Sequence, residues 1–355
     1  MNYQQEFEDI IQLMLKQNAS DLHITVGRHP TIRIDGSLVE LAKKPVLTEE
    51  VAREFIFLML SKEQKEEYVK NKELDFSYSY RGVARFRVNV FFQRGFMGSA
   101  LRFISTKIRT FEELKLPEIL TDFCLKPQGF FLCVGPTGHG KTTTLAAMVD
   151  YINHNRNDHV ITIEDPIEYL FSSDRCIVDQ REVGFDTSSF AVALRSMFRE
   201  DVDVAMIGEM RDAETMAAAV TAAETGHLIL SSLHTNNAAQ TIDRIIDSFP
   251  ADQQNQIRSQ LSNTLVGIVS QRLVPRTEGG LVPAVEIMIA NSAIKNLIRE
   301  NRMHEIDLVI ETSSDEGMVS LNRSLVDLTR MGEIGLESAI NYSLNPGELQ
   351  LLLKK

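Results

Sequence analysis

A glycine-rich loop between an apolar strand and a helix constrains this chain more than any other feature. The loop and the residue after it are Gly135, Pro136, Thr137, Gly138, His139, Gly140, Lys141, Thr142 and Thr143. The continuous apolar run before it, residues 129–134, predicts a buried strand of a parallel sheet, and residues 141–152 predict a helix. Glycines let backbone N–H groups converge on anionic oxygens, and the helix N-terminus favours negative charge. The sequence therefore predicts a phosphate-binding loop.

Two residues of this loop predict its ligands. Lys141 is placed to reach the β- and γ-phosphates, and the Thr142 hydroxyl is placed to ligate Mg²⁺. ATP and Mg²⁺ are therefore the expected ligands. The side chain of His139 is not constrained by this argument, because a backbone contact is what its position requires.

Two glutamates follow predicted buried strands. Glu164 comes directly after residues 161–163, and Glu209 follows residues 204–208. Phosphate chemistry needs an acid that orients the metal and a group that positions water. Since ligands of open α/β sheets bind at the carboxyl ends of strands, both glutamates are candidates for these roles.

Two histidines flank the predicted strand at residues 228–233. His227 precedes this strand and His234 follows it, so the two are seven residues apart. Strict alternation would put them on opposite faces of the sheet. Each is a candidate catalytic residue, and a purely structural role stays open for each.

Hydrophobic patterning divides the chain into parts. Residues 1–105 predict an α+β domain, with helices near 5–17 and 47–70 and strands elsewhere. Residues 106–117 contain polar residues and end at a proline, which predicts a linker. Residues 118–285 alternate strands (129–134, 159–163, 202–207, 228–233) with helices (141–152, 190–199, 213–225), the pattern of a doubly wound α/β core. Residues 286–355 are expected to form a small helical subdomain.

Composition excludes several functional classes. The chain has 355 residues, which suggests more than one core, and its net charge of −12 with no basic stripe argues against a nucleic-acid partner. The three cysteines form no Cys-x-x-Cys pair, which argues against structural zinc and fits a reducing compartment. No signal peptide or membrane-spanning run is found, so we expect a cytoplasmic protein without direct membrane insertion. A membrane-anchored partner stays possible.

Four motifs stand in order along the chain. They are the loop at 135–142, then residues 163–168, then residues 207–212, and then the histidine segments 225–227 and 233–235. This order resembles the secretion ATPase superfamily, which drives type II secretion, type IV pili and related machines. That family calls the motifs Walker A, the aspartate box, an atypical Walker B and the histidine box.

Within this superfamily the chain resembles the motors that retract pili. It is short, and it lacks the tetracysteine zinc motif that pilus-extension and type II secretion ATPases commonly carry. Residues 293–300 are similar to the AIRNLIRE signature of retraction motors, with Lys295 in place of arginine. Spacing alone predicts only an amphipathic helix there, with Ile294, Leu297 and Ile298 on one face.

The resemblance implies a PAS-like N-terminal domain, a RecA-like ATPase core and a ring of six subunits. It implies that Glu164 positions or activates water and that Glu209 helps to organise the metal. It also implies that Arg87 and Arg102 reach the phosphates at a subunit or domain junction, although a solvated strand face would explain both arginines. The implied partners are an inner-membrane platform protein, at which the motor docks, and possibly a second related ATPase.

Two positions depart from the family pattern. His139 stands where the family usually has serine, and Val202 replaces the proline usual before Asp203. The expected function is a hexameric ATPase for pilus retraction and twitching motility. The alternatives are a pilus-extension or type II secretion ATPase, and an accessory partner that binds nucleotide and modulates a retraction motor.

Overall fold

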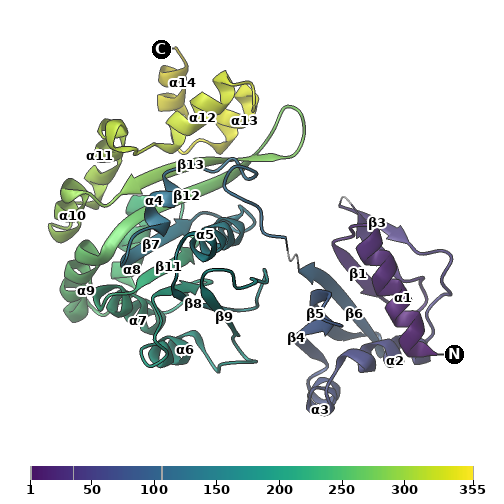
Figure 1. The fold of residues 1–355 in the computed structure, drawn as a ribbon. Coiled ribbons are helices and arrows are strands. Elements are labelled where there is room, and N and C mark those ends of the chain that lie inside the picture. Colours follow the sequence, from purple (N-terminus) through teal and green to yellow (C-terminus); the bar gives the residue numbers. More distant parts are fainter. Residues whose placement is uncertain (1, 35, 105–106, 355) are drawn as a thin grey trace. The chain divides into compact units, whose positions relative to one another are not determined.

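The computed structural model describes residues 2–34, 36–104 and 107–354 (Figure 1). The chain divides into two compact units. One contains residues up to 106 together with Glu168–Leu170, and the other contains the remaining residues from Lys107 onward. The expected end of the N-terminal domain, residue 105, and the first residue of the expected linker, residue 106, lie outside the described residues.

The N-terminal unit is a six-stranded antiparallel sheet with three helices. The strands lie in the order β3-β2-β1-β6-β5-β4. Their bounds are β1 Asp21–Ile24, β2 Thr31–Ile34, β3 Ser37–Glu40, β4 Glu73–Tyr80, β5 Ala84–Gln93 and β6 Phe96–Ile104. The helices are α1 Tyr3–Lys16, α2 Glu49–Met59 and α3 Lys62–Asn71. This arrangement confirms the predicted α+β character.

The single helix expected near residues 47–70 is two helices. Leu60 has φ −101° and ψ 137°, an extended conformation that ends α2. Ser61 then begins α3 with a capping box, in which its side chain accepts from the Gln64 N–H and the Gln64 side chain accepts from the Ser61 N–H. Leu60 and Ser61 include no glycine or proline that would have marked the break in the sequence.

The second unit contains a seven-stranded mixed sheet in the order β13-β12-β7-β11-β10-β8-β9. β12 and β13 pair antiparallel, and the other neighbours pair parallel. The bounds are β7 Gly129–Val134, β8 His159–Glu164, β9 Ile177–Glu182, β10 Val204–Ile207, β11 Leu228–Leu233, β12 Leu265–Pro275 and β13 Leu281–Ile289. The four predicted strands are present, whereas β9, β12 and β13 were not predicted.

Helices cover both faces of this sheet. They are α4 Leu120–Cys124, α5 Lys141–Asn155, α6 Phe190–Met197, α7 Ala213–Glu224, α8 Ala238–Asp247 and α9 Ala251–Thr264. The alternating side chains of β7 divide between two cores. Phe130 and Leu132 share one core with α6 to α9, and Phe131 and Cys133 share the other with α4 and α5. The predicted doubly wound, RecA-like fold is therefore confirmed.

The C-terminal helices begin later than expected. β13 runs to Ile289, so the expected start of the helical subdomain at residue 286 falls inside a strand of the main sheet. The helices that follow are α10 Ser292–Arg299, α11 Ile306–Thr312, α12 Leu321–Arg330, α13 Leu336–Tyr342 and α14 Pro346–Lys354. Figure 1 shows α12, α13 and α14 gathered beside β12 and β13, and residues of these helices share a core with Val274, Val282 and Ala284.

Residues 107–117 pack on the second unit. Leu116 is buried in the core that contains Phe123 and Phe131, and the Phe111 ring lies 5.5 Å from the ring of Tyr151 on α5. Apolar side chains at Phe111, Leu114 and Leu116 explain why this segment is held there. Among the described helices, none combines the length and apolar character needed to cross a membrane.

Candidate nucleotide site

The glycine-rich loop joins the buried strand β7 to helix α5. Gly135, Gly138 and Gly140 have φ angles of 145°, 80° and 80°, which side chains rarely tolerate. A Cβ atom on Gly135 would lie 2.3 Å from the carbonyl oxygen of Gln271 on β12. The loop is thus both tightly turned and pressed against a neighbouring strand, as a phosphate-binding loop requires.

Lys141, the first residue of α5, folds back over the loop. Its Nζ atom donates to the carbonyl oxygens of Gly135 at 2.9 Å and Pro136 at 3.0 Å. The same Nζ lies 3.3 Å from Nδ1 of His234. The side chain is only 7% exposed, so the ammonium group is held in a defined place at the loop.

The predicted acidic and histidine residues meet the loop at one edge of the sheet. β7, β8, β10 and β11 run parallel, so their carboxyl ends share an edge. Glu164 is the last residue of β8, Glu209 lies two residues after β10, and His234 directly follows β11. The structure therefore brings Lys141, Glu164, Glu209 and His234 to the same edge as the loop.

Glu209 is held between two basic side chains. Its Oε2 atom accepts from Nε2 of His234 at 2.8 Å, and its Oε1 atom pairs with Arg211. Partial burial on its own would raise the pKa of this carboxyl, but the hydrogen bonds from His234 and Arg211 outweigh it and lower the pKa. Glu209 is therefore a carboxylate at neutral pH. Arg211 also lies 3.5 Å from Asp165, next to Glu164.

Glu164 is buried, with 3% of the residue exposed. Its Oε1 atom accepts from the Thr162 hydroxyl at 2.7 Å and from the Gln180 amide at 3.3 Å. Gly208 packs directly against it, because a Cβ atom on Gly208 would lie 3.6 Å from the Glu164 Cα. The two acidic strand ends are thus adjacent, since β8 and β10 are paired neighbours in the sheet.

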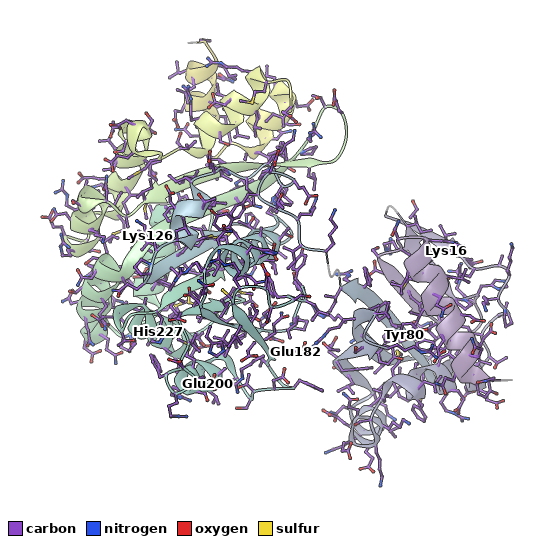
Figure 2. All side chains as sticks on the ribbon, in the orientation of Figure 1. Lys16, Tyr80, Lys126, Glu182, Glu200 and His227 are labelled. Atoms are coloured by element: carbon purple, nitrogen blue, oxygen red, sulfur yellow. The ribbon has the colours of Figure 1, made fainter. Side chains whose placement is uncertain are left out.

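His227 does not join this group. It precedes β11, at the amino end of the strand, whereas His234 follows the carboxyl end. Its Nδ1 atom lies 2.9 Å from the Ala222 carbonyl oxygen, and its ring packs edge-on against Phe198. Figure 2 labels His227 within the unit that contains the seven-stranded sheet. The six residues between the two histidines form one complete strand, so the histidines lie at opposite edges of the sheet. Of these two histidines, His234 lies beside the loop and His227 does not.

Arg87 and Arg102 belong to the N-terminal unit. They are cross-strand partners on β5 and β6, and both side chains are exposed, whereas Phe86 and Val88 beside them are buried. Nε of Arg102 donates to Asp21 at 2.9 Å. The structure thus places the two arginines together on one exposed sheet face.

The sequence did not predict a pocket of about 500 Å³ beside the loop. Gly140, Thr143 and Thr144 line one side of it. Other lining residues come from the segment before α4 and from the β12–β13 hairpin, among them Arg109, Leu116, Leu273 and Arg276. The pocket combines apolar side chains with charged ones of both signs next to the phosphate loop, a mixture that is common in small-molecule sites. Only the fold brings these distant segments together, so no local signal marked them.

Gln271 on β12 is a further residue that the sequence did not indicate. It is 2% exposed, its Nε2 atom donates to the His139 carbonyl at 2.8 Å, and its Oε1 atom accepts from the Thr144 hydroxyl at 2.7 Å. It therefore joins the phosphate loop to the first turn of α5. No local signal marked it, because β12 itself was not predicted from the sequence.

Comparison with known proteins identifies the family of the chain. The family model described as type II/IV secretion system protein matches residues 3–280. This chain belongs to the type II/IV secretion system protein family. Among its relatives, the type IV pilus ATPase PilU of Pseudomonas aeruginosa is 44% identical over 350 residues, which cover 98% of this chain and 91% of PilU.

Other members of this family are equally similar. The type IV pilus retraction ATPase PilT of Pseudomonas aeruginosa is 44% identical over 334 residues, which cover 94% of this chain and 97% of PilT. A crystal structure of the pilus retraction motor PilT with bound ADP has a TM-score of 0.91 and 46% identity, and the match covers 97% of this chain and 98% of that one. The chain thus shares both the fold and most of the length of these family members.

Proposed function

We propose that this chain is an ATPase that powers the retraction of type IV pili and thereby twitching motility. The contact of His234 with both Lys141 and Glu209 carries the proposal, because it joins the phosphate loop to the acidic residue that follows strand β10. The similarity to PilT and PilU over almost the whole chain supports the same activity.

Each residue at this edge has a distinct role in the proposal. Lys141 and the loop N–H groups hold the β- and γ-phosphates, and the pocket beside Thr143 and Thr144 holds the nucleoside. Glu164, fixed by Thr162 and Gln180, orients the attacking water. His234, rather than His227, senses the nucleotide, since it alone of the two touches Lys141.

Mg²⁺ enters this proposal as part of the substrate, MgATP. Among the residues that the structure describes, no group of three or more His, Cys, Asp or Glu is arranged to hold a metal. Magnesium commonly takes one or two protein oxygens and completes its shell with phosphates and water. The Thr142 hydroxyl and Glu209 fit that requirement, because each bonded carboxylate oxygen of Glu209 keeps a further lone pair. When bound, the ion neutralises charge that develops on the phosphates.

The assembly is also part of the proposal. Six copies form a ring in the cytoplasm, which docks on a platform protein of the inner membrane and has no nucleic-acid partner. Arg87 and Arg102, exposed and adjacent, contribute positive charge toward the phosphates at a subunit or domain junction. A second related ATPase is a further candidate partner, because this chain resembles PilU and PilT to the same extent.

The proposal is tested by ATP turnover of the purified full-length chain and two variants. We expect Lys141→Ala and Glu209→Ala to lower kcat at least about 100-fold, because Lys141 supplies positive charge to the reacting phosphate and Glu209 helps to hold the Mg²⁺ that does the same. Lys126→Ala is the control, since this exposed lysine precedes the amino end of β7 and lies far along the strand from the loop. Turnover near that of the wild type in both site variants would overturn the assignment of the site.

Two further readouts separate this function from the alternatives. Deletion of the gene in a piliated host should leave pili that no longer retract, whereas loss of an extension motor would leave no pili. ATP binding without turnover by the purified wild-type chain would favour an accessory partner instead.

A further inference from the structure

His139 of the phosphate loop makes two contacts that the proposed chemistry does not use. Its Nδ1 atom accepts a hydrogen bond of 2.9 Å from the backbone N–H of Leu273 on β12. Its ring lies 6.3 Å from the ring of Tyr342, at an interplanar angle of 70°. The edge-to-face arrangement is a favourable one for aromatic rings. His139 thus links the loop to a strand and to a C-terminal helix.

The backbone of His139 is tied to the same strand. Its carbonyl oxygen accepts from the buried side chain of Gln271, two residues before Leu273. The His139 residue is therefore held by its main chain and by its side chain at one short stretch of β12. Because Lys141 lies only two residues further along, a shift of His139 would move the ammonium group that serves the phosphates.

Tyr342 connects this stretch to the C-terminal helices. It is the last residue of α13, and it packs against the core formed by α12, α13 and α14 with the β12–β13 hairpin. A movement of α13 relative to β12 would therefore be transmitted to the loop through the ring contact between Tyr342 and His139. No other feature of the loop requires an aromatic side chain at position 139.

The electrostatic surroundings keep the His139 contact in place at neutral pH. Burial, together with the positive charges of Arg272 and Lys141, lowers the pKa of His139. A neutral imidazole keeps Nδ1 free of a proton, which lets it accept from Leu273. Serine, which the superfamily usually has at this position, has a shorter side chain and no ring for Tyr342.

We propose that His139 is a positioning residue that couples the placement of helix α13 to the phosphate loop, so that displacement of the C-terminal helices changes the affinity for ATP. This inference rests on the proposed ATPase function. It extends that function, because the position of helices α12 to α14 would then regulate the binding of nucleotide.

The test is a double-mutant cycle between His139 and Tyr342 in the full-length protein. The variants are His139→Ser, Tyr342→Ala and the double variant, with kcat and KM for ATP measured for each. A binding constant for a non-hydrolysable ATP analogue is measured as well. We expect each single variant to raise KM and the dissociation constant for the analogue about 3- to 10-fold. This is the effect expected from the loss of one hydrogen bond or one ring contact. Tyr342→Ala should have no further effect once His139 is serine.

Conservative variants separate positioning from simple destabilisation. His139→Asn offers an acceptor for Leu273 but no ring, so it should recover part of the affinity lost in His139→Ser. Tyr342→Phe keeps the ring and should behave as the wild type. The coupling would be overturned if the increase in KM of the double variant equalled the product of the two single increases. An unchanged KM in His139→Ser would also overturn it. If the wild type itself shows no turnover, the ATPase function fails, whereas the binding constants still test the coupling.

Discussion

Nδ1 of His234 lies 3.3 Å from the ammonium nitrogen of Lys141. An ammonium group can only donate and a carboxylate can only accept, so the contacts of His234 fix its tautomer. Nε2 carries the proton and donates to Glu209, while Nδ1 accepts from Lys141. The imidazole therefore orders the lysine and the carboxylate relative to each other.

Replacement of His234 should affect turnover more than binding. His234→Ala removes the bridge but leaves the loop, so we expect kcat to fall about 10- to 100-fold with a smaller change in KM. Steady-state ATP hydrolysis measures both constants. His227→Ala is the matched control, because His227 lies at the other edge of the sheet, away from Lys141. Equal losses of kcat in the two variants would contradict the separate placement of the histidines.

The glycines of the loop should differ in their tolerance of alanine. At Gly135 a Cβ atom would meet the Gln271 carbonyl oxygen at 2.3 Å, whereas at Gly138 nothing lies within 4 Å. Both have positive φ, so alanine at Gly138 should destabilise the chain by about 1 kcal/mol through strain alone. Gly135→Ala should add a clash with the main chain of about 1–3 kcal/mol. Thermal unfolding measures the difference, and equal melting temperatures would refute it.

The buried carboxyl of Glu286 should make stability depend on pH. Its Oε1 atom accepts from the Ala238 N–H at 2.8 Å. Burial raises its pKa from 4.5 to about 7, with Asp307 adding to the effect and the Ala238 hydrogen bond opposing it. The folded state therefore holds the proton more tightly than the unfolded state. This stabilising contribution is complete below about pH 4.5 and is lost as the pH rises through about 7.

Glu286→Gln keeps the acceptor for Ala238 and removes the titration. We expect the variant to be more stable than the wild type at pH 8.5 by on the order of 1–3 kcal/mol, and the difference to shrink at pH 5.5. Chemical denaturation at the two pH values measures it. Glu278→Gln, at an exposed position of the β12–β13 hairpin, is the control. A difference in stability between Glu286→Gln and the wild type that is the same at both pH values would show that the titration of Glu286 does not affect stability.

The parts of the site that the sequence predicted are those that local pattern determines. The apolar run before Gly135 and the positions of Glu164 and Glu209 after apolar runs are local features, and parallel strands then bring their ends together. Gln271 and Arg276 were not predicted, because their roles depend on the packing of β12 against a loop more than a hundred residues earlier. The strands β12 and β13 were missed for a related reason. Polar residues such as Ser270 and Arg272 interrupt the apolar pattern of β12, although the strand pairs with β13 from Gly267 to Pro275.

The pairing of β12 with β7 has a consequence for the order in which the protein matures. Leu132 and Cys133 of β7 pair with Ile268 and Val269 of β12, and Gln271 then supports the loop. On the ribosome, residues 129–143 emerge long before residue 265. The complete motif is therefore synthesised before β12, the strand that supports it. Long-range pairing of this kind is slow because the closure of a long loop must come first. A nascent chain should therefore acquire a firmly shaped nucleotide site only after the whole sheet has been synthesised.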